Sequence, residues 1–160
     1  MLPHRRCTLA PWKTTALAMA ASFAALGCET QEKACTLIGC QSGLVISFAA
    51  ANWPAGTYQV VAQTPSGQRS CSVALPLASD GQATCTGAMT LGTSGSALPA
   101  AQHSLVGVQL PDDPTQVTLT VTRDGSQLAN KAFAPAYKVS QPNGAGCEPV
   151  CKQASEQLSW

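Results

Sequence analysis

Cysteine supplies most of the chemistry that this chain could perform. A thiol can be acylated, can pair into a disulfide, or can bind a metal ion as a thiolate. The spacing of the cysteines and the segments around them decide among these uses. The 160-residue chain has eight: Cys7, Cys28, Cys35, Cys40, Cys71, Cys85, Cys147 and Cys151.

Cys28 follows a short apolar segment close to the N-terminus. Residues 14–26 are rich in Ala and Leu and come after the basic residues Arg5, Arg6 and Lys13. A run of about 13 apolar residues fits the apolar region of a signal peptide. It is too short for a membrane-spanning helix, which needs about 20.

The junction Ala24-Ala25-Leu26-Gly27-Cys28 resembles the cleavage site of a bacterial lipoprotein signal. The resemblance implies that residues 1–27 are removed and that Cys28 becomes an acylated N-terminus carrying diacylglycerol and palmitate-type chains. The match is partial, because Ala25 stands where that pattern prefers Leu. An ordinary secretory signal is one alternative, and a twin-arginine signal at Arg5-Arg6 is another.

The composition predicts one small domain after the signal. Removal of residues 1–27 leaves 133 residues, with six basic and eight acidic side chains. This balance gives no basic surface for nucleic acid. Charged residues make up 11% and aromatic residues 5% of the chain, so we expect an extracytoplasmic β-domain that depends partly on disulfides.

Short β-type runs alternate with turn signals along the rest of the chain. The clearest is 117–122, where three aliphatic residues alternate with three threonines, as in a strand with one dry face. Turns are expected at 53–56, at 64–67, at 79–82 and at Arg123-Asp124-Gly125-Ser126, which suits a type I′ hairpin. Seven or eight strands result, over 44–48, 57–62, 70–75, 83–91, 104–110, 115–122 and 127–133.

This pattern predicts an all-β fold, an antiparallel β-sandwich of immunoglobulin-like or transthyretin-like outline. A small closed barrel is the alternative, because it has the same alternation. The expected parts are the signal peptide 1–27, the lipidated Cys28 with a tether and head over 28–42, the sandwich over 43–140, and a cysteine-containing tail over 141–160.

Six cysteines remain when Cys7 leaves with the signal and Cys28 takes the lipid. Cys71 and Cys85 lie in neighbouring predicted strands, so we expect them to pair across a hairpin. The other four are at the two ends of the domain. Two bonds between head and tail are expected, although three pairings of Cys35, Cys40, Cys147 and Cys151 stay open.

Metal and redox sites are alternative uses of these cysteines. The C-x4-C and C-x3-C spacings differ from the C-x2-C typical of zinc sites, and an oxidising compartment favours disulfides. A thioredoxin-like dithiol needs C-x-x-C at a helix N-terminus. We therefore expect no cofactor and no metal centre.

Few other residues suggest catalysis. His103 is the one histidine after the signal, and it opens a predicted strand, where a surface position is usual. No G-x-S-x-G elbow accompanies it, so no catalytic residue is assigned. The loop carboxylates Asp112 and Asp113 are weak calcium candidates, which would need Asp80 or Asp124 at the same end.

The chain as a whole resembles small cysteine-rich lipoproteins of the myxobacterial type. The resemblance rests on the Cys28 junction, the Cys35–Cys40 head, the Asp124-Gly125 hairpin and the tail 143–151. It implies a location and a fold, with no assigned reaction or ligand. By analogy, Glu29 after the lipidated cysteine favours the outer membrane.

The sequence therefore predicts a lipid-anchored cell-envelope protein with a structural or binding role. Its partners are the membrane, through Cys28, and an envelope protein or glycan. The alternative is an envelope hydrolase or a small inhibitor of an envelope enzyme, built around His103 or an exposed loop.

Overall fold

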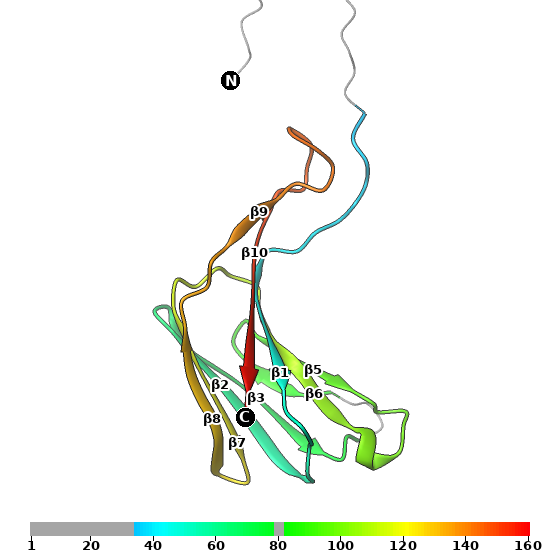
Figure 1. The fold of residues 1–160 in the computed structure, drawn as a ribbon, viewed down its shortest axis with the longest axis vertical. Coiled ribbons are helices and arrows are strands. Elements are labelled where there is room, and N and C mark those ends of the chain that lie inside the picture. The colour runs from blue at the N-terminus through cyan, green and yellow to red at the C-terminus, as the bar shows by residue number, and fades with distance from the viewer. Residues whose placement is uncertain (1–33, 79–81) are drawn as a thin grey trace, which may run out of the picture. The chain divides into compact units, whose positions relative to one another are not determined.

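The computed structural model describes residues 34–78 and 82–160, and in that part the chain forms two β-sheets (Figure 1). The short 3-10 turn η1 spans Ala100–Gln102. The strands are β1 (Gly43–Ala49), β2 (Gly56–Thr64), β3 (Gly67–Leu75), β4 (Thr84–Thr86), β5 (Thr90–Ser94), β6 (Ser104–Leu110), β7 (Val117–Arg123), β8 (Ser126–Phe133), β9 (Lys138–Ser140) and β10 (Cys151–Ser159).

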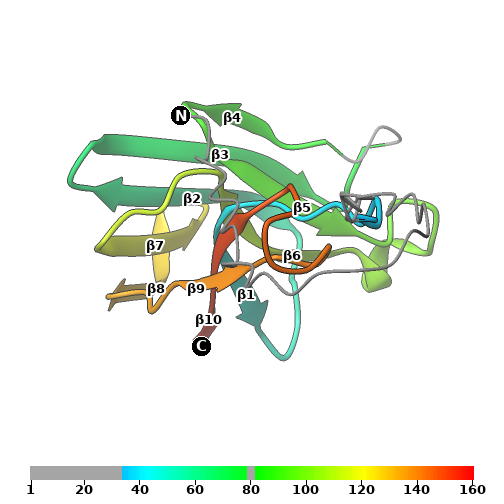
Figure 2. The same ribbon diagram turned by 90° about the horizontal axis from the view of Figure 1, so that it is seen from above.

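Each sheet has five strands, and the two sheets form the layers of a sandwich (Figure 2). The order in sheet A is β5-β6-β1-β10-β9, and in sheet B it is β4-β3-β2-β7-β8. The predicted all-β sandwich is thus confirmed. One strand pair differs from the expected antiparallel arrangement, because β1 and β10 run parallel.

The core lies between the sheets, where alternate residues of each strand point inward. In β7 the aliphatic residues Val117, Leu119 and Val121 are buried, whereas the threonines between them are partly exposed. The predicted dry and wet faces of this strand are confirmed. Sheet A contributes the fully buried Leu44 and Ile46 of β1 to the same core.

The hairpin turns follow their local residue types. Thr64 pairs with Gly67 where β2 turns into β3. At the β7–β8 turn, Asp124 and Gly125 have φ values of 52° and 81°, and a type I′ turn requires positive φ at both positions. The backbone N–H and a side-chain oxygen of Asp124 also bond to Thr57, which attaches the turn to the start of β2.

The expected strand 83–91 is two strands. Gly87 has φ of 75°, a left-handed conformation that interrupts the ladder and favours glycine. β4 therefore ends at Thr86 in sheet B, and β5 begins at Thr90 in sheet A. The chain changes sheets at this point.

The region expected to be a tail ends in a nine-residue strand. β10 lies between β1 and β9 and pairs with β1 from Gly43–Gln153 to Ala49–Ser159. Its sequence, CKQASEQLS, has no β-branched residue and buries Cys151, Ala154 and Leu158 at irregular intervals. Neither strand propensity nor period-two alternation marks it, so its strand form depends on its neighbours.

Candidate functional surfaces

The residue expected to carry the lipid, Cys28, lies outside the described residues, as does Asp80. The described part begins at Ala34, six residues after Cys28. Within it, no helix has the length and apolar character needed to cross a bilayer. The features that the structure does place are three disulfides, a charged loop, a buried histidine, an aromatic cluster and several surface hollows.

Three disulfides join the six remaining cysteines. Cys71 and Cys85, which face each other on β3 and β4, are bonded with their Cα atoms 4.0 Å apart, so the predicted pairing is confirmed. Head and tail are joined twice, by Cys35–Cys147 and Cys40–Cys151, with Cα separations of 5.8 and 6.1 Å. The six sulfurs are therefore not thiolates, the form that binds zinc.

We call residues 34–42 together with 141–151 the stapled end. Between its two disulfides, the buried Asn143 acts as a polar clamp. Its Oδ1 accepts the backbone N–H of Ile38 at 2.9 Å, and its Nδ2 donates to the Ile38 carbonyl at 3.0 Å and to the Glu148 carbonyl at 2.5 Å. The hydroxyl of Thr36 donates to the same Oδ1 at 2.5 Å. The side-chain amide of Asn143 thus hydrogen-bonds to backbone groups of both segments, at Ile38 and at Glu148.

Asn143 was not singled out by sequence reasoning. Asn in the run Pro-Asn-Gly is typical of a turn, and nothing local indicates that its side chain bonds to a residue more than 100 positions away. Only the pairing of the terminal cysteines brings the two segments together.

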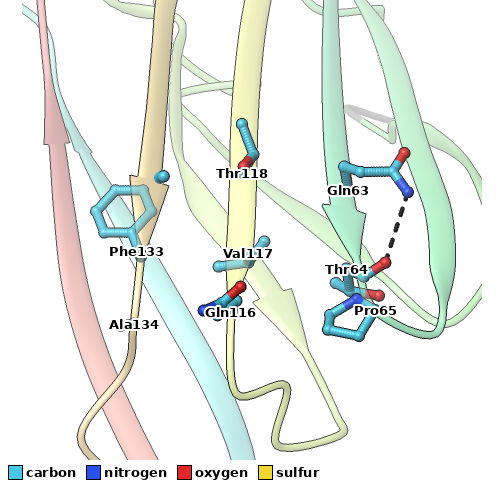
Figure 3. A pocket seen from close by; sticks show the side chains of 9 residues that line it. Gln63, Thr64, Pro65, Gln116, Val117, Thr118, Phe133 and Ala134 are labelled. Atoms are coloured by element: carbon cyan, nitrogen blue, oxygen red, sulfur yellow. Dashed lines mark hydrogen bonds between the residues drawn. The ribbon is translucent and has the colours of Figure 1, made fainter.

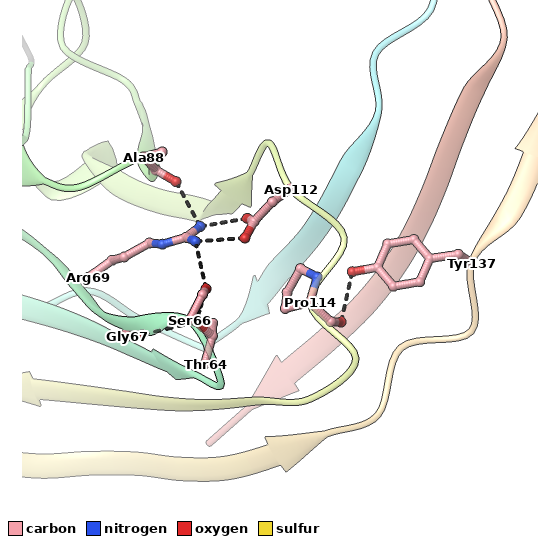
Figure 4. Close-up of polar contacts among 8 residues, drawn as sticks. All are labelled: Thr64, Ser66, Gly67, Arg69, Ala88, Asp112, Pro114 and Tyr137. Atoms are coloured by element: carbon pink, nitrogen blue, oxygen red, sulfur yellow. Dashed lines mark hydrogen bonds and ion pairs between the residues drawn. The ribbon is translucent and has the colours of Figure 1, made fainter.

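The loop between β6 and β7 carries Asp112 and Asp113, and each carboxylate faces a different cation. Both oxygens of Asp112 accept hydrogen bonds from the Arg69 guanidinium, at 2.5 and 2.6 Å (Figure 4). Asp113 pairs with Lys152 at the start of β10. The loop that crosses between the sheets is therefore ion-paired to a strand of each.

These contacts change the proton affinity of the groups around the loop. Hydrogen bonding from Arg69 lowers the pKa of Asp112, and Lys152 lowers the pKa of Asp113. Partial burial and the two nearby carboxylates raise the pKa of Tyr137 to about 12. The Tyr137 hydroxyl donates to the Pro114 carbonyl at 3.1 Å, so it also holds the loop.

The calcium candidates are not brought together into a cation site. Asp112 and Asp113 face Arg69 and Lys152, and Asp124 lies at the opposite end of β7. Across the described residues, no group of three or more His, Cys, Asp or Glu side chains could hold a metal ion. Asp124 therefore does not meet the condition that calcium binding by the 112–113 loop would need, a further carboxylate at the same end.

His103 is buried, with 7% of its surface exposed, and the expected surface position is therefore wrong. The Leu77 N–H donates to Nδ1 at 2.8 Å, so the proton is on Nε2, which donates to the Leu98 carbonyl at 2.9 Å. Both ring nitrogens are used by loop backbone, that of Leu77 just after β3 and that of Leu98 before η1. The ring ties these two segments together, and its hydrogen bonds to the described residues all go to backbone groups, not to the carboxylate or hydroxyl that a hydrolase would require.

An aromatic cluster occupies the end of the sandwich away from the disulfides at 35–40 and 147–151. Trp53 packs against Tyr58 and Trp160 with ring centroids 5.4 and 5.2 Å apart, and Phe48 lies 5.6 Å from Trp160. We call Phe48, Trp53, Tyr58 and Trp160 the aromatic end. Trp53 and Trp160 are both partly buried and pack against the core.

The surface hollows contain few groups that could do chemistry. One of about 490 Å³ lies where β2 ends beside β7 and β8, and Figure 3 shows its lining, which includes Gln63, Thr64, Val117 and Phe133. None of its lining residues is titratable. Another, of about 430 Å³, borders Trp53 at the aromatic end. Their linings suit contact with a partner better than acid–base chemistry.

No family model, no curated protein and no solved structure matches this chain. A functional assignment therefore depends on the surfaces described above.

Proposed function

We propose that this protein is a lipid-anchored component of the bacterial cell envelope, held through Cys28 in the outer membrane, with a structural or binding role and no catalysis. The observation that carries the proposal is the covalent joining of the segment just after Cys28 to the last strand of the fold. Cys35 and Cys40 attach to Cys147 and Cys151, beside and within β10. An anchor attached there is linked covalently to β10, an interior strand of sheet A.

Three disulfides in one small domain also support an extracytoplasmic location, because cytoplasmic thiols are kept reduced. The contact surface of the proposed module is the set of loops at the aromatic end, which lie farthest along β1 and β10 from the anchor. Trp53 and its hollow offer rigid amphipathic area there. The partner is an envelope protein or a glycan.

Mass spectrometry tests the anchoring directly. The full chain, expressed with its own signal in a bacterium that processes lipoproteins, is expected to begin at Cys28 and to carry acyl chains on that residue. The Cys28→Ser variant is the matched control and is expected in the unacylated form. A wild-type chain without acyl chains at Cys28 would overturn the proposal.

A further inference from the structure

The stapled end exposes a concentration of large apolar side chains. Among the described residues, seven large hydrophobic side chains are exposed, and four lie in or beside this end. Leu37 is 100% exposed and Ile38 54%, while Val150 and Val139 of the adjoining β9 are 48% and 71% exposed. In Figure 1 this region stands beyond the two sheets, at the end where the chain enters the fold.

The loop between Cys35 and Cys40 is suited to an apolar surface in two further respects. Residues 34–42 contain no charged side chain, so contact with lipid removes no charge from water. Asn143 already binds both the N–H and the carbonyl of Ile38. An unsatisfied backbone group is costly at a membrane, and at Ile38 this cost is absent.

The length of chain before the fold determines what lies near this loop. Cys28 precedes Cys35 by seven residues, which span at most about 25 Å when fully extended. If acyl chains on Cys28 sit in the bilayer, Leu37 and Ile38 are kept within reach of the membrane surface. The aromatic end lies farther away by the length of β1 and β10, which both run from the stapled end towards it.

We propose that the stapled end docks on the lipid bilayer, with Leu37 and Ile38 inserted at the interface, so that the sandwich stands with its aromatic end away from the membrane. The proposal rests on the acylation of Cys28 described above. The two disulfides and the Asn143 clamp hold the apolar loop in place, so docking does not require the loop to become ordered on contact.

Tryptophan fluorescence with brominated lipids tests this contact. The acylated full chain is incorporated into phosphatidylethanolamine–phosphatidylglycerol vesicles that contain phosphatidylcholine with brominated acyl chains, which quench a tryptophan only on close approach. The test variant is Leu37→Trp. The control is Leu98→Trp, because Leu98 is similarly apolar and 53% exposed but lies in the loop before η1. Trp53 and Trp160 provide the background signal.

We expect brominated lipid to reduce the added fluorescence of Leu37→Trp and to leave Leu98→Trp and the wild type unchanged. An unquenched Leu37→Trp would overturn the docking, and equal quenching of both variants would overturn the upright orientation. Peptide mass under non-reducing conditions checks that all three disulfides persist in both variants.

The same preparations separate the two proposals. A mass without acyl chains overturns the anchoring, and quenching of that unacylated Leu37→Trp chain by added vesicles would still support the contact. An acylated chain with an unquenched Leu37→Trp overturns the contact alone.

Discussion

The two ends of this sandwich are held together by different forces. The stapled end has two disulfides and the Asn143 clamp, and the ion-paired 112–113 loop, which follows the β6 strand paired with β1, is outside it. The aromatic end has none of these disulfides and is closed by four rings, of the six aromatic residues in the described part. Covalent bonds fix the end nearest the predicted anchor, and side-chain packing fixes the other.

The comparison shows how a chain with few aromatic residues and few charges can make a stable domain. The rings are concentrated where β1 and β10 finish, and the disulfides where they begin. Because the two strands are parallel, each kind of stabilisation acts on both strands at once. Substitutions at the two ends are therefore expected to lower the free energy of unfolding by different amounts.

The largest expected effect comes from removing both disulfides of the stapled end. Each closes a loop of more than 100 residues, with separations of 112 and 111. When one of these disulfides is already formed, however, the other closes only a short ring, which consists of residues 35–40 and 147–151. In the chain-entropy model, loss of either pair alone then costs about 3 kcal/mol, whereas loss of both costs about 7 kcal/mol.

Urea denaturation of paired Cys→Ser variants measures these costs. The control is Cys71→Ser with Cys85→Ser, whose 14-residue separation predicts a loss of about 3 kcal/mol. Equal effects for the single and double removals at the stapled end would contradict the expected costs, because the disulfide left after a single removal should still close a loop of more than 100 residues.

At the aromatic end, Trp53→Ala is expected to lower the free energy of unfolding by about 3 kcal/mol, the low end for an aromatic truncation, because Trp53 is only partly buried. It removes contacts with Phe48, Tyr58 and Trp160 together. The measurement is again urea denaturation, now with the disulfides intact. Trp160→Ala is the comparison and is expected to cost less, since Trp53 retains Tyr58. An unchanged stability of Trp53→Ala would mean that this end needs no ring packing.

The smallest expected effect is that of the charged loop. Arg69 lowers the pKa of Asp112 below its unfolded value, so the contribution of the pair is full above pH 4 and is lost as the pH falls through the lower folded pKa. Since the Asp112 side chain is 38% exposed, solvent screening limits this contribution to about 1 kcal/mol. Asp112→Asn is expected to lower stability at neutral pH by that amount.

The measurement is thermal unfolding across acidic pH. The difference in stability between the wild type and Asp112→Asn is expected to shrink as the pH falls below the unfolded pKa of about 4, and to vanish only below the lowered folded pKa of Asp112. Asp124→Asn serves as the control, because Asp124 lies at the other end of β7. A difference that persists unchanged at low pH would show that the Arg69 pair contributes through packing alone.

The sequence was sufficient to predict the fold class where residue type and periodicity agree. The alternation in 117–122, the Asp124-Gly125 turn and the Cys71–Cys85 pair are all local signals, and all are confirmed. Each of these features depends on residues that are close in sequence, so the local residue types are enough to predict it.

β10 and His103 show why the rest could not be predicted. β10 has weak strand propensity and becomes a strand because β1, β9 and two nearby disulfides position it. His103 is buried because Leu77 and Leu98, 26 and five residues away, supply both of its hydrogen bonds. These features follow from long-range contacts, which a one-dimensional pattern does not contain.

The parallel pairing of β1 with β10 has a consequence for the order in which the molecule can assemble. Sheet A lacks β10, one of its interior strands, until residues 151–159 have been synthesised, and Cys35 and Cys40 have no native partner until more than 100 further residues have followed them. Cys71 and Cys85 are only 14 positions apart in the sequence, so they can bond early. Sheet B, whose strands lie between Gly56 and Phe133, can therefore form before β10 is made, whereas sheet A and its two long-range disulfides are completed only afterwards.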